Sequence, residues 1–331
     1  MENIDFLGIG DITTDAFIRL KDAQVHCDIN NDDCTICMRF GDKIPFEDAT
    51  VVPAVGNSPN AATSAHRLGL NSALLTWVGD DQFAKEDLAH LKEEGLSTDL
   101  VQQQEGMGTN YHYVLSYEAE RTILVKHYEY DYALPEFPEP TFMYLSSLAE
   151  NSLPFHHEIA TYLEQHPDVK LAFQPGTFQM KLGYENLKDL YAHTYLFFCN
   201  KEEAQRILET DETELTKLTS MMHERGPVIP IITDGPDGAI AYDSTKDTHY
   251  FAPMYPDPKP PVERTGAGDS FSSTVTSALA LGEDLPTALS WGPINSMNVV
   301  QHIGAQKGLL SKEKLLEYLA NGPEDYKVTT L

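Results

Sequence analysis

The sequence predicts an α/β protein whose core is a mostly parallel β-sheet covered by helices. Stretches with the character of strands alternate along the chain with stretches that have the spacing of amphipathic helices, an order typical of parallel sheets. The chain has 331 residues, of which 41% are hydrophobic and 10% aromatic, so it is long and apolar enough to bury a sizeable core. Two segments break the alternation and indicate a small β element set apart from the main sheet.

The first half of the chain begins with a predicted strand at residues 3–10, which ends in glycine. A helix is expected over residues 60–68, because small and apolar residues recur there at the i, i+4 and i+7 positions of one face. Residues 72–78 form the next predicted strand. The helix after it has its apolar face at residues 84–91, and Gly95 is a stop signal.

The second half continues the same alternation. Strands are predicted at 169–173, 194–199 and 228–233, and a Gly-Pro-Asp-Gly turn then leads into an extended run at 239–242. The last third is expected to be helical near 268–281, 286–302 and 311–320.

The two segments that break the pattern are residues 16–50 and 111–130. The first mixes aromatic residues, acids and cysteines without helical periodicity, and the second has the pattern of a hairpin with a polar turn at 118–121. Because ligands bind at the strand ends of open α/β sheets, such a β element could cover a site there. The alternative is an edge hairpin that only packs against its neighbours.

The composition excludes several classes of function. The chain has 23 Lys and Arg against 51 Asp and Glu, a formal net charge of −28, which argues against duplex DNA, RNA or an anionic membrane as the main partner. No run approaches the roughly 20 apolar residues that cross a bilayer. The first residues have no basic and apolar signal-peptide pattern, so we expect a cytoplasmic protein.

Four cysteines in a chain of this length do not make a disulfide scaffold. Three of them cluster near His26, as Cys27, Cys34 and Cys37, and this group could supply four soft ligands to zinc. The paired spacing that is usual for zinc occurs only once. Reduced cysteines in a loop or strand are therefore the favoured interpretation, and zinc is the alternative.

The sharpest motif is Val-Glu-Arg-Thr-Gly-Ala-Gly-Asp-Ser-Phe at 262–271. Gly266, Ala267 and Gly268 make a turn of small residues before a helix, where backbone N–H groups can converge on an anion. The helix N-terminus adds about half a positive charge. Asp269, in the first turn, either caps its own helix or accepts a proton from a hydroxyl that attacks a bound phosphoryl group.

The stretch Thr-Gly-Ala-Gly-Asp-Ser-Phe at 265–271 closely resembles the C-terminal signature of the ribokinase-like, pfkB-type carbohydrate kinases. The likeness runs in order over nearly the whole chain. It implies a three-layer αβα sandwich with a mostly parallel sheet and a small β lid. We therefore expect one kinase domain over residues 1–331, with a lid formed by about 16–50 and 111–130. The resemblance also implies that Asp269 is the catalytic base and that the glycine turn is the anion hole.

The segment Gly-Asp-Ile-Thr-Thr-Asp at 10–15 is similar to the end of the family's first strand, whose last aspartate binds sugar hydroxyls. The resemblance implies this role for Asp15. Taken alone, residues 8–13 half resemble a dinucleotide fingerprint. They lack its third glycine, and no helix pattern follows, so NAD binding is not favoured.

Gly-Asn-Ser-Pro-Asn-Ala-Ala at 56–62 is similar to the family's N-terminal signature, and Gly56 and Asn60 match its sugar-contacting positions. An N-terminal cap is the alternative role for Asn60. Val55 stands where a second glycine is usual, and Asn57 where ribokinases commonly have lysine. Both departures weaken an assignment to ribose itself.

The nucleotide side is matched by two segments. Asn-Lys-Glu-Glu at 200–203 resembles an Asn-x-x-Glu motif, which implies that Asn200 lies near the phosphates and that Glu203 orients hydrated Mg²⁺. A surface acid that only stabilises its helix is the alternative for Glu203. The segment at 233–238 resembles a nucleotide-binding stretch, with Thr233, Gly235 and Gly238 contacting ATP, although a plain hairpin turn has the same composition.

The resemblance implies an ATP-dependent kinase that phosphorylates a fructose- or ribose-like sugar. In many family members a monovalent cation binds near the Gly-Ala stretch at 301–306, and here Glu263 stands where they often carry aspartate, so K⁺ is possible. The alternatives are a nucleoside kinase, which would use lid aromatics for the base, and a nucleotide-binding sensor without turnover. Family lids often pair between subunits, which suggests a homodimer.

Overall fold

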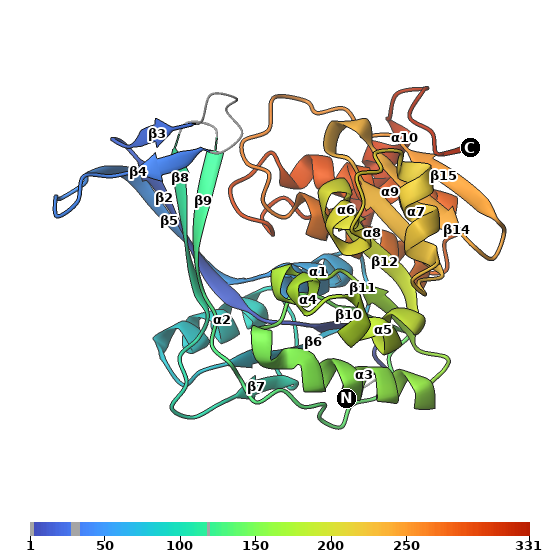
Figure 1. The fold of residues 1–331 in the computed structure, drawn as a ribbon, viewed down its shortest axis with the longest axis horizontal. Coiled ribbons are helices and arrows are strands. Elements are labelled where there is room, and N and C mark those ends of the chain that lie inside the picture. The colour runs from blue at the N-terminus through green and yellow to red at the C-terminus, as the bar shows by residue number, and fades with distance from the viewer. Residues whose placement is uncertain (1–2, 28–33, 118–119) are drawn as a thin grey trace.

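The computed structural model describes residues 3–27, 34–117 and 120–331, and it contains one central β-sheet with helices on both faces (Figure 1). In this sheet the strands follow the order β16-β15-β14-β13-β12-β11-β10-β1-β6-β7. The neighbours from β13 to β7 pair in parallel, and β14, β15 and β16 complete one edge in antiparallel fashion. The predicted α/β class with a mostly parallel sheet is confirmed.

The parallel strands fall where the sequence predicts them or in stretches it left unassigned. Their bounds are β1 Phe6–Ile9, β6 Ser72–Val78, β7 Val101–Gln103, β10 Phe142–Leu145, β11 Lys170–Phe173, β12 Thr194–Asn200 and β13 Ile229–Thr233. The antiparallel edge is β14 Ala239–Asp243, β15 Thr248–Ala252 and β16 Thr329–Thr330. Six parallel strands are buried almost throughout, as expected of a sheet that is covered on both faces.

Helices cover both faces of the central sheet, and each face has its own set of buried side chains. On one face are α1 Asn57–Arg67, α2 Gln82–Glu93, α8 Ala267–Ala280, α9 Leu285–Val299 and α10 Lys312–Ala320. The other face has α3 Leu153–Gln165, α5 Tyr184–Ala192, α6 Lys201–Leu208 and α7 Leu215–His223, with the short α4 Thr177–Leu182 nearby. Two 3-10 turns, Glu150–Ser152 and Gly235–Asp237, complete the list.

The two cores follow from the twofold alternation of side chains along a strand. In β10, for example, Met143 and Leu145 pack toward α3 and α5, whereas Phe142 and Tyr144 pack toward α8 and α9. The result is the three-layer sandwich that the resemblance implies.

The two segments predicted as a lid form a separate four-stranded sheet with the order β5-β2-β8-β9, which we call the lid after that prediction, and it projects from the body at the upper left of Figure 1. Its strands are β2 Thr13–Leu20, β5 Phe46–Val55, β8 Tyr111–Tyr117 and β9 Glu120–Lys126. A two-stranded hairpin, β3 Gln24–His26 and β4 Thr35–Cys37, lies at its far end. The hairpin predicted within 111–130 is therefore present, although residues 118–119 of its turn lie outside the described part.

The cysteine cluster lies on that terminal hairpin. Cys27 and Cys34 form a disulfide, so the prediction of reduced cysteines is wrong for these two residues. A zinc site on His26 and the three cysteines would lack two of its thiolates. Cys37 is free and partly buried. Within the described residues, no group of three or more His, Cys, Asp or Glu side chains is arranged to hold a metal ion.

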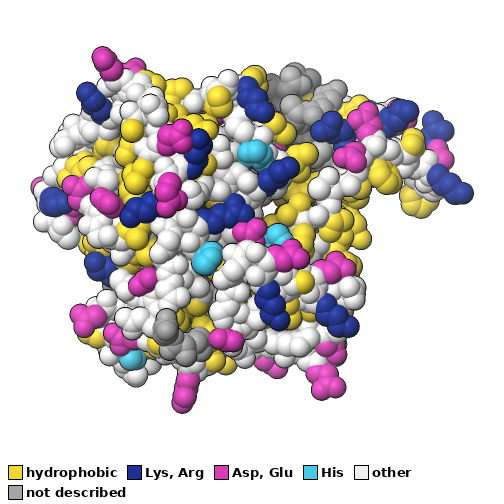
Figure 2. Space-filling model, turned by 180° about the vertical axis from the view of Figure 1, so that it is seen from behind, with side chains coloured by type: hydrophobic (Ala, Val, Ile, Leu, Met, Phe, Trp, Pro, Cys, Tyr) yellow, Lys and Arg dark blue, Asp and Glu magenta, His cyan; other side chains and the backbone are white. Residues whose placement is uncertain are grey.

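The surface carries acidic side chains over much of the face shown in Figure 2, with lysines and arginines between them. Among the helices of the described residues, none is both long and apolar enough to cross a bilayer.

Candidate active site

The candidate site lies at the carboxyl ends of the parallel strands, where open α/β sheets bind their ligands. Asp11 follows β1, Gln174 follows β11, and Asn200 ends β12. The first turn of α8 and the inner ends of the lid strands meet the same edge, because Asp269 and Asp15 lie close enough for their charges to interact. The fold thus brings together residues that are more than 250 positions apart.

The glycine turn before α8 has the conformation that the sequence predicts. Gly266 has φ 79°, in the left-handed region, and a Cβ there would lie 2.4 Å from the Cβ of Ala305. Only glycine satisfies both conditions. By contrast, a Cβ on Gly268 would meet only the amide nitrogen of Gln174, at 3.7 Å. The first N–H groups of α8 have no acceptor within the helix, so this turn can receive an anion.

Asp269 is almost fully buried in the first turn of α8, and its carboxylate is held by amides from other elements. Asn57 donates to Oδ1 at 2.7 Å, Asn60 to Oδ2 at 2.8 Å, and Gln174 to Oδ1 at 3.2 Å. Burial raises the pKa of Asp269, the three amide donors oppose that rise, and the charge of Asp15 adds to it. These side-chain contacts are not those of a helix cap.

Asn60 does not cap a helix, which was the alternative role considered for it. It lies inside α1, which begins at Asn57, and its side chain points into the site rather than along its own helix. Its Oδ1 accepts a hydrogen bond from Gln306 at 3.1 Å, which fixes the orientation of the amide toward Asp269. Gly56 precedes the helix with φ 122°, and a Cβ there would lie 2.6 Å from the backbone oxygen of Asp11.

Asp15 lies on β2, directly opposite His112 of β8. Its Oδ1 is 3.2 Å from His112 Nδ1, within ion-pair distance, although no hydrogen bond to this buried oxygen has good geometry. The carboxylate therefore retains capacity to accept hydrogen bonds from another molecule.

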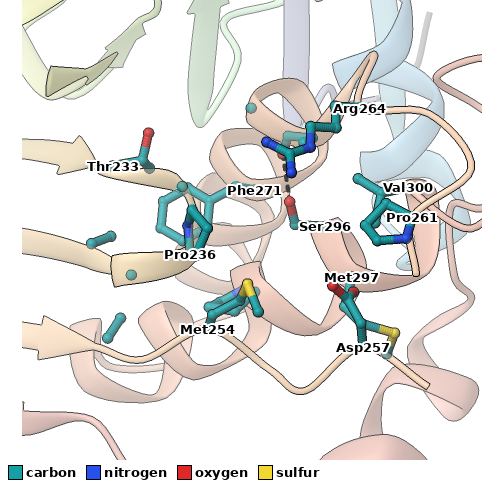
Figure 3. A pocket seen from close by; sticks show the side chains of 17 residues that line it. Thr233, Pro236, Met254, Asp257, Pro261, Arg264, Phe271, Ser296, Met297 and Val300 are labelled. Carbon is teal, nitrogen blue, oxygen red and sulfur yellow. Dashed lines mark hydrogen bonds between the residues drawn. The ribbon is translucent and has the colours of Figure 1, made fainter. Parts of the chain in front are cut away.

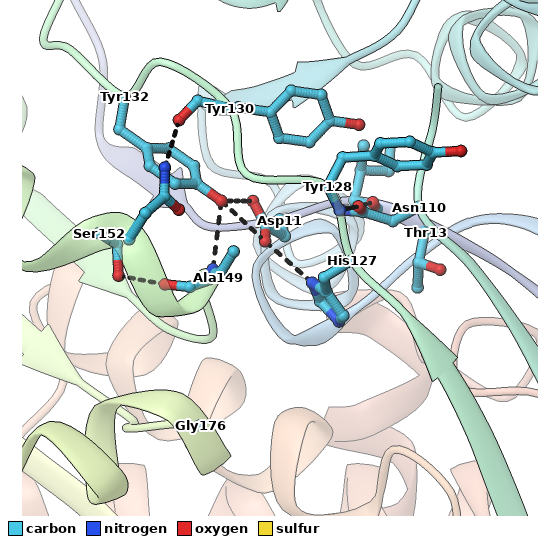
Figure 4. Close-up of polar contacts among 12 residues, drawn as sticks. Asp11, Thr13, Asn110, His127, Tyr128, Tyr130, Tyr132, Ala149, Ser152 and Gly176 are labelled. Carbon is cyan, nitrogen blue, oxygen red and sulfur yellow. Dashed lines mark hydrogen bonds and ion pairs between the residues drawn. The ribbon is translucent and has the colours of Figure 1, made fainter. Parts of the chain in front are cut away.

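A polar network is centred on Asp11, which follows β1 (Figure 4). The Tyr132 hydroxyl donates to both oxygens of Asp11, at 3.0 and 3.1 Å, and His127 Nδ1 lies 3.1 Å from Oδ2. Burial raises the pKa of Asp11, and the contacts with His127 and Tyr132 oppose that rise. The same tyrosine hydroxyl accepts the N–H of Ala149, so the network joins strand ends to the segment before α3.

A cavity of about 260 Å³ lies between β13–β14 and the helices α8 and α9 (Figure 3). Three of the predicted ATP-contacting residues, Thr233, Gly235 and Gly238, line it together with Gly268, whereas Asn200 and Glu203 are not among its lining residues. Its walls are largely apolar, and its charged side chains are Arg264 and Asp257. The apolar lining consists mainly of Met254, Phe271, Pro293, Met297 and Val300.

Asn200 and Glu203 form a reciprocal capping box at the start of α6. Asn200 Oδ1 accepts the N–H of Glu203 at 2.8 Å, and Glu203 Oε2 accepts the N–H of Asn200 at 2.9 Å. Glu203 thus does stabilise its own helix, as the alternative to metal binding expects. This contact uses only one of its two carboxylate oxygens. Burial raises the pKa of Glu203, and the nearby charge of Asp269 adds to the increase. A divalent cation would favour the ionised forms of Glu203 and Asp269, whose neighbouring charges oppose ionisation. Mg²⁺ suits such a site because it binds few protein ligands and keeps several waters.

Glu263 is already engaged by neighbouring groups. Its Oε1 accepts the N–H of Thr265 at 3.2 Å, and its Oε2 accepts the N–H of Gly304 at 3.1 Å. Arg121 of the lid lies 3.5 Å from Oε1. Glu263 therefore ties the loop before α8 to the 301–306 segment and to the lid.

Four residues that the sequence did not single out belong to this site: Asn57, Gln174, His112 and His127. Asn57 is a departure from the family pattern, yet it makes the shortest bond to Asp269. The other three come from a strand end and the lid, and no local motif marks them. The position of Gln174 directly after a predicted strand is the one signal that could have found it.

Comparison with known proteins gives a consistent set of relatives. The model of the family described as pfkB family carbohydrate kinase matches residues 34–312. A ribokinase from Bacillus subtilis is 24% identical over 280 residues, covering 80% of this chain and 87% of its own. A nucleoside kinase from Methanocaldococcus jannaschii is 26% identical (80% and 84% covered), and a fructoselysine 6-kinase from Escherichia coli 27% (76% and 90%).

Solved structures agree on the fold. The crystal structure of the Methanocaldococcus jannaschii nucleoside kinase, described as an archaeal member of the ribokinase family, superposes with a TM-score of 0.78 at 21% identity. That match covers 96% of this chain and 98% of the other. Arabidopsis thaliana ribokinase, complexed with ribose and ATP, gives a TM-score of 0.77 at 16% identity, covering 96% and 99%.

Proposed function

Because the chain belongs to the pfkB family of carbohydrate kinases, we propose that it transfers the γ-phosphate of ATP to a hydroxyl of a fructose- or ribose-like sugar, with Asp269 as general base. The family makes it a phosphotransferase that acts on a carbohydrate hydroxyl, using ATP and a divalent metal. The observation that carries the proposal is the buried Asp269 carboxylate beside the open N-terminus of α8. We treat residues 1–331 as one kinase domain with a lid.

The transfer step follows from this arrangement. The acceptor oxygen attacks the γ-phosphorus in line, the bond from phosphorus to the bridging oxygen of ADP breaks, and the hydroxyl proton passes to Asp269. The amides of Asn57, Asn60 and Gln174 keep the carboxylate oriented. Backbone N–H groups of the turn Gly266, Ala267 and Gly268 stabilise the charge on the transferred group.

On the acceptor side, Asp15, Gly56 and Asn60 bind the sugar. The carboxylate of Asp15 accepts hydrogen bonds from hydroxyls, which suits a neutral polyol. Gly56 approaches the backbone of Asp11 too closely to carry a side chain, because a Cβ there would lie 2.6 Å from the Asp11 oxygen.

On the donor side, Asn200, Thr233, Gly235 and Gly238 contact ATP, and the apolar cavity beside them takes the base. Glu203 would hold hydrated Mg²⁺ through water, and the ion would supply charge neutralisation for the phosphates. A K⁺ ion near Glu263 belongs to the proposal as an optional activator. We propose a cytoplasmic location, where ATP is available.

The lid also supports a homodimer. Its strands expose Val51, Tyr113 and Leu124 on one face of the sheet, and Ile123 and Val125 on the other. A partner could cover the first group, because exposed apolar patches commonly mark interaction surfaces.

A second candidate is an acceptor that carries an anionic group. Arg19 and Arg121 both lie directly opposite Ser116 in the lid, so they share its face. Together with Lys21 and Arg264 they line a cavity of about 1000 Å³ between the lid and the loop before α8, which is also lined by Glu47, Asp48 and Glu263. Four basic and three acidic side chains leave one positive charge in excess, and a carboxylate or phosphate would compete with Glu263 for Arg121.

The test is an ADP-release screen with MgATP across ketoses, aldoses, sugar acids, sugar phosphates and nucleosides. Stimulation by a neutral sugar supports the main proposal, and stimulation by a sugar acid or phosphate alone supports the second candidate. A preference for a nucleoside would replace the proposed substrate. Absence of stimulation by every acceptor would favour a nucleotide-binding sensor.

A variant pair tests the base. Asp269→Asn should fold normally and lose roughly 10²–10⁴-fold in turnover, because general base catalysis contributes a rate factor of this size. Asp168→Asn, an exposed position, is the matched control and should retain turnover. Unchanged turnover in Asp269→Asn would refute the role of this carboxylate.

A further inference from the structure

The two oxygens of the Asp269 carboxylate differ in how many hydrogen bonds they receive. Oδ1 accepts two, from Asn57 at 2.7 Å and from Gln174 at 3.2 Å, whereas Oδ2 accepts one, from Asn60 at 2.8 Å. Each carboxylate oxygen offers about two accepting positions. Among the described residues no other group donates to either oxygen, so Oδ1 is filled and one accepting position remains, on Oδ2.

The amide of Gln174 is itself held by a tyrosine of the core. The hydroxyl of Tyr144, on β10, donates to Gln174 Oε1 and lies 2.7 Å from Ser272 Oγ of α8. Ser272 Oγ lies 3.1 Å from the same amide oxygen but 2.8 Å from the backbone oxygen of Gly268, so its single proton has a closer acceptor within the helix. Tyr144 is therefore the main donor to Gln174, and the amide nitrogen of Gln174 is left to face Asp269.

Tyr144 keeps the Gln174 amide in this orientation whether or not Asp269 is charged. A reversed amide would place its oxygen 3.2 Å from Asp269 Oδ1, where two acceptors repel. That repulsion weakens once Asp269 has taken a proton, but the hydrogen bond from Tyr144 does not depend on the charge. The tyrosine ring is rigidly placed, because it is fully buried and stacks on Phe6 with 5.5 Å between ring centroids.

We propose that Gln174 is a positioning residue for Asp269, that Tyr144 acts through Gln174, and that the proton of the acceptor hydroxyl goes to Oδ2 of Asp269. This inference rests on the proposed function of Asp269 as general base. As the acceptor oxygen bonds to the γ-phosphorus and the bridging oxygen of ADP leaves, the hydroxyl proton reaches the one oxygen with an accepting position open. Protonation of Oδ1 would instead displace Asn57 or Gln174.

The titratable groups that interact with Asp269 are Asp15 of the lid, Glu203 of α6 and Tyr144. Burial raises the pKa of Tyr144 well above its usual value, so this hydroxyl keeps its proton. Burial also raises the pKa of Asp269, and the hydrogen bonds from the three amides oppose that rise. Loss of an amide donor should therefore raise the pKa of Asp269 further. Gln174→Met and Tyr144→Phe remove donors without changing any charge.

The first measurement follows the ionisation of Asp269 directly and needs no activity. Carbon-13 spectra of aspartate-labelled protein give the pKa of each carboxyl group, and Asp269→Asn identifies its signal. Gln174→Met should raise the pKa of Asp269 by about one unit, the effect of one hydrogen bond to a charged group, and Tyr144→Phe should raise it by less. In the double variant the pKa should equal that of Gln174→Met alone, because Tyr144 acts only through Gln174.

Tyr255→Phe is the matched control for these titrations. Tyr255 is another buried tyrosine of the same core, and its hydroxyl donates to the backbone oxygen of Tyr318 in α10, so its removal should leave the pKa of Asp269 unchanged. Equal pKa values of Asp269 in the wild type and in either Gln174→Met or Tyr144→Phe would overturn the proposal. An additive rise in the double variant would also overturn it, because Tyr144 would then act by another route.

The second measurement locates the proton on the carboxyl group. Neutron diffraction from crystals kept below the pKa of Asp269 distinguishes a proton on Oδ1 from one on Oδ2. We expect it on Oδ2, with Asn57 and Gln174 still donating to Oδ1. A proton on Oδ1 would overturn the assignment of the accepting oxygen.

The third measurement follows kcat and KM against pH for the acceptor that the screen identifies. The acid limb of kcat/KM should move to higher pH in the same order as the pKa values, because the base must be ionised. Two pH units above the limb, the loss in Gln174→Met should fall on kcat rather than on KM. Variants that lose stability but keep the wild-type limb would show a merely structural role and overturn the proposal. If no acceptor is phosphorylated but the pKa values follow the expected order, the proposed function fails and the link from Tyr144 through Gln174 to Asp269 stands.

Discussion

The buried carboxylate of Asp87 should make the stability of this protein depend strongly on pH. Asp87 lies on α2 with no exposed surface, and its Oδ1 accepts the N–H of Ala54 at 2.7 Å and the hydroxyl of Thr14 at 2.8 Å. Its other oxygen has no hydrogen-bond partner among the described residues. Burial raises its pKa from 3.8 to about 7. Asp87 therefore connects lid strands β2 and β5 near the body of the protein, through Thr14 and Ala54. Its buried carboxyl group favours the neutral form.

The size of the effect follows from that pKa. Each pKa unit corresponds to about 1.36 kcal/mol, so the full difference between the folded and unfolded states is about 4 kcal/mol. Because the folded pKa is the higher one, the folded state binds more protons than the unfolded state between about pH 4 and pH 7. The stabilisation from proton uptake is complete below pH 4 and is lost as pH rises through 7.

The perturbation that isolates this effect is Asp87→Asn, which keeps an acceptor for Ala54 and Thr14 but cannot ionise. Urea unfolding at pH 5 and pH 8 gives the free energy of unfolding of both proteins. Relative to the variant, the wild type should lose about 3 kcal/mol between these two pH values. The exposed Asp168→Asn should not change the pH dependence. Parallel curves for the wild type and Asp87→Asn would refute the reasoning.

Four further predictions concern the turn before α8, the divalent metal and the cap of α2. Gly268→Ala should fold with a free energy of unfolding within about 1 kcal/mol of the wild type and lose at least about tenfold in turnover, because its Cβ has room but stands beside the anion. Gly266→Ala should instead lose about 2 kcal/mol or more in urea unfolding, from its positive φ and its contact with Ala305. Excess EDTA should abolish ADP formation and Mg²⁺ should restore it; activity in EDTA would contradict the Glu203 assignment. Asp81→Ala, which removes the cap of α2, should cost about 1 kcal/mol, measured by thermal unfolding.

The α/β class, most of the helices and the hairpin could be predicted because each depends on a pattern within one short segment. The apolar run of β6 and the small-residue turn before α8 are examples. The environment of Asp269 could not be predicted in this way, because its contact with Asn57 joins residues that are 212 positions apart. Asn57 was a departure from the family pattern at the level of sequence, and only the fold shows that its amide contacts the same carboxylate as Asn60.

The contact between His112 and His127, whose Nε2 atoms lie 3.1 Å apart, could not be predicted from the sequence either. His112 lies in a strand with aromatic neighbours, where its most natural interpretation is packing in a hairpin. His127 follows the next strand, and the register of β8 with β9 alone places it near His112 without fixing which ring atoms meet. Their Nε2 contact depends also on Asp11, which orients the ring of His127 through Nδ1. A pairwise pattern in the sequence cannot specify an arrangement that three residues determine together.

The net charge of −28 finally bears on how this protein can hold a nucleotide. The charged residues that line the nucleotide cavity are Arg264 and Asp257, so the cavity has no net charge of its own to set against the phosphates. Nearby, Glu203 and Asp269 add negative charge, and burial raises the pKa of both. A polyanion can bind there only if other positive groups offset these acids. The open N–H groups at the start of α8 and a divalent cation are the two that the fold and the family supply, so phosphate binding in this protein depends on backbone geometry and metal rather than on a basic surface.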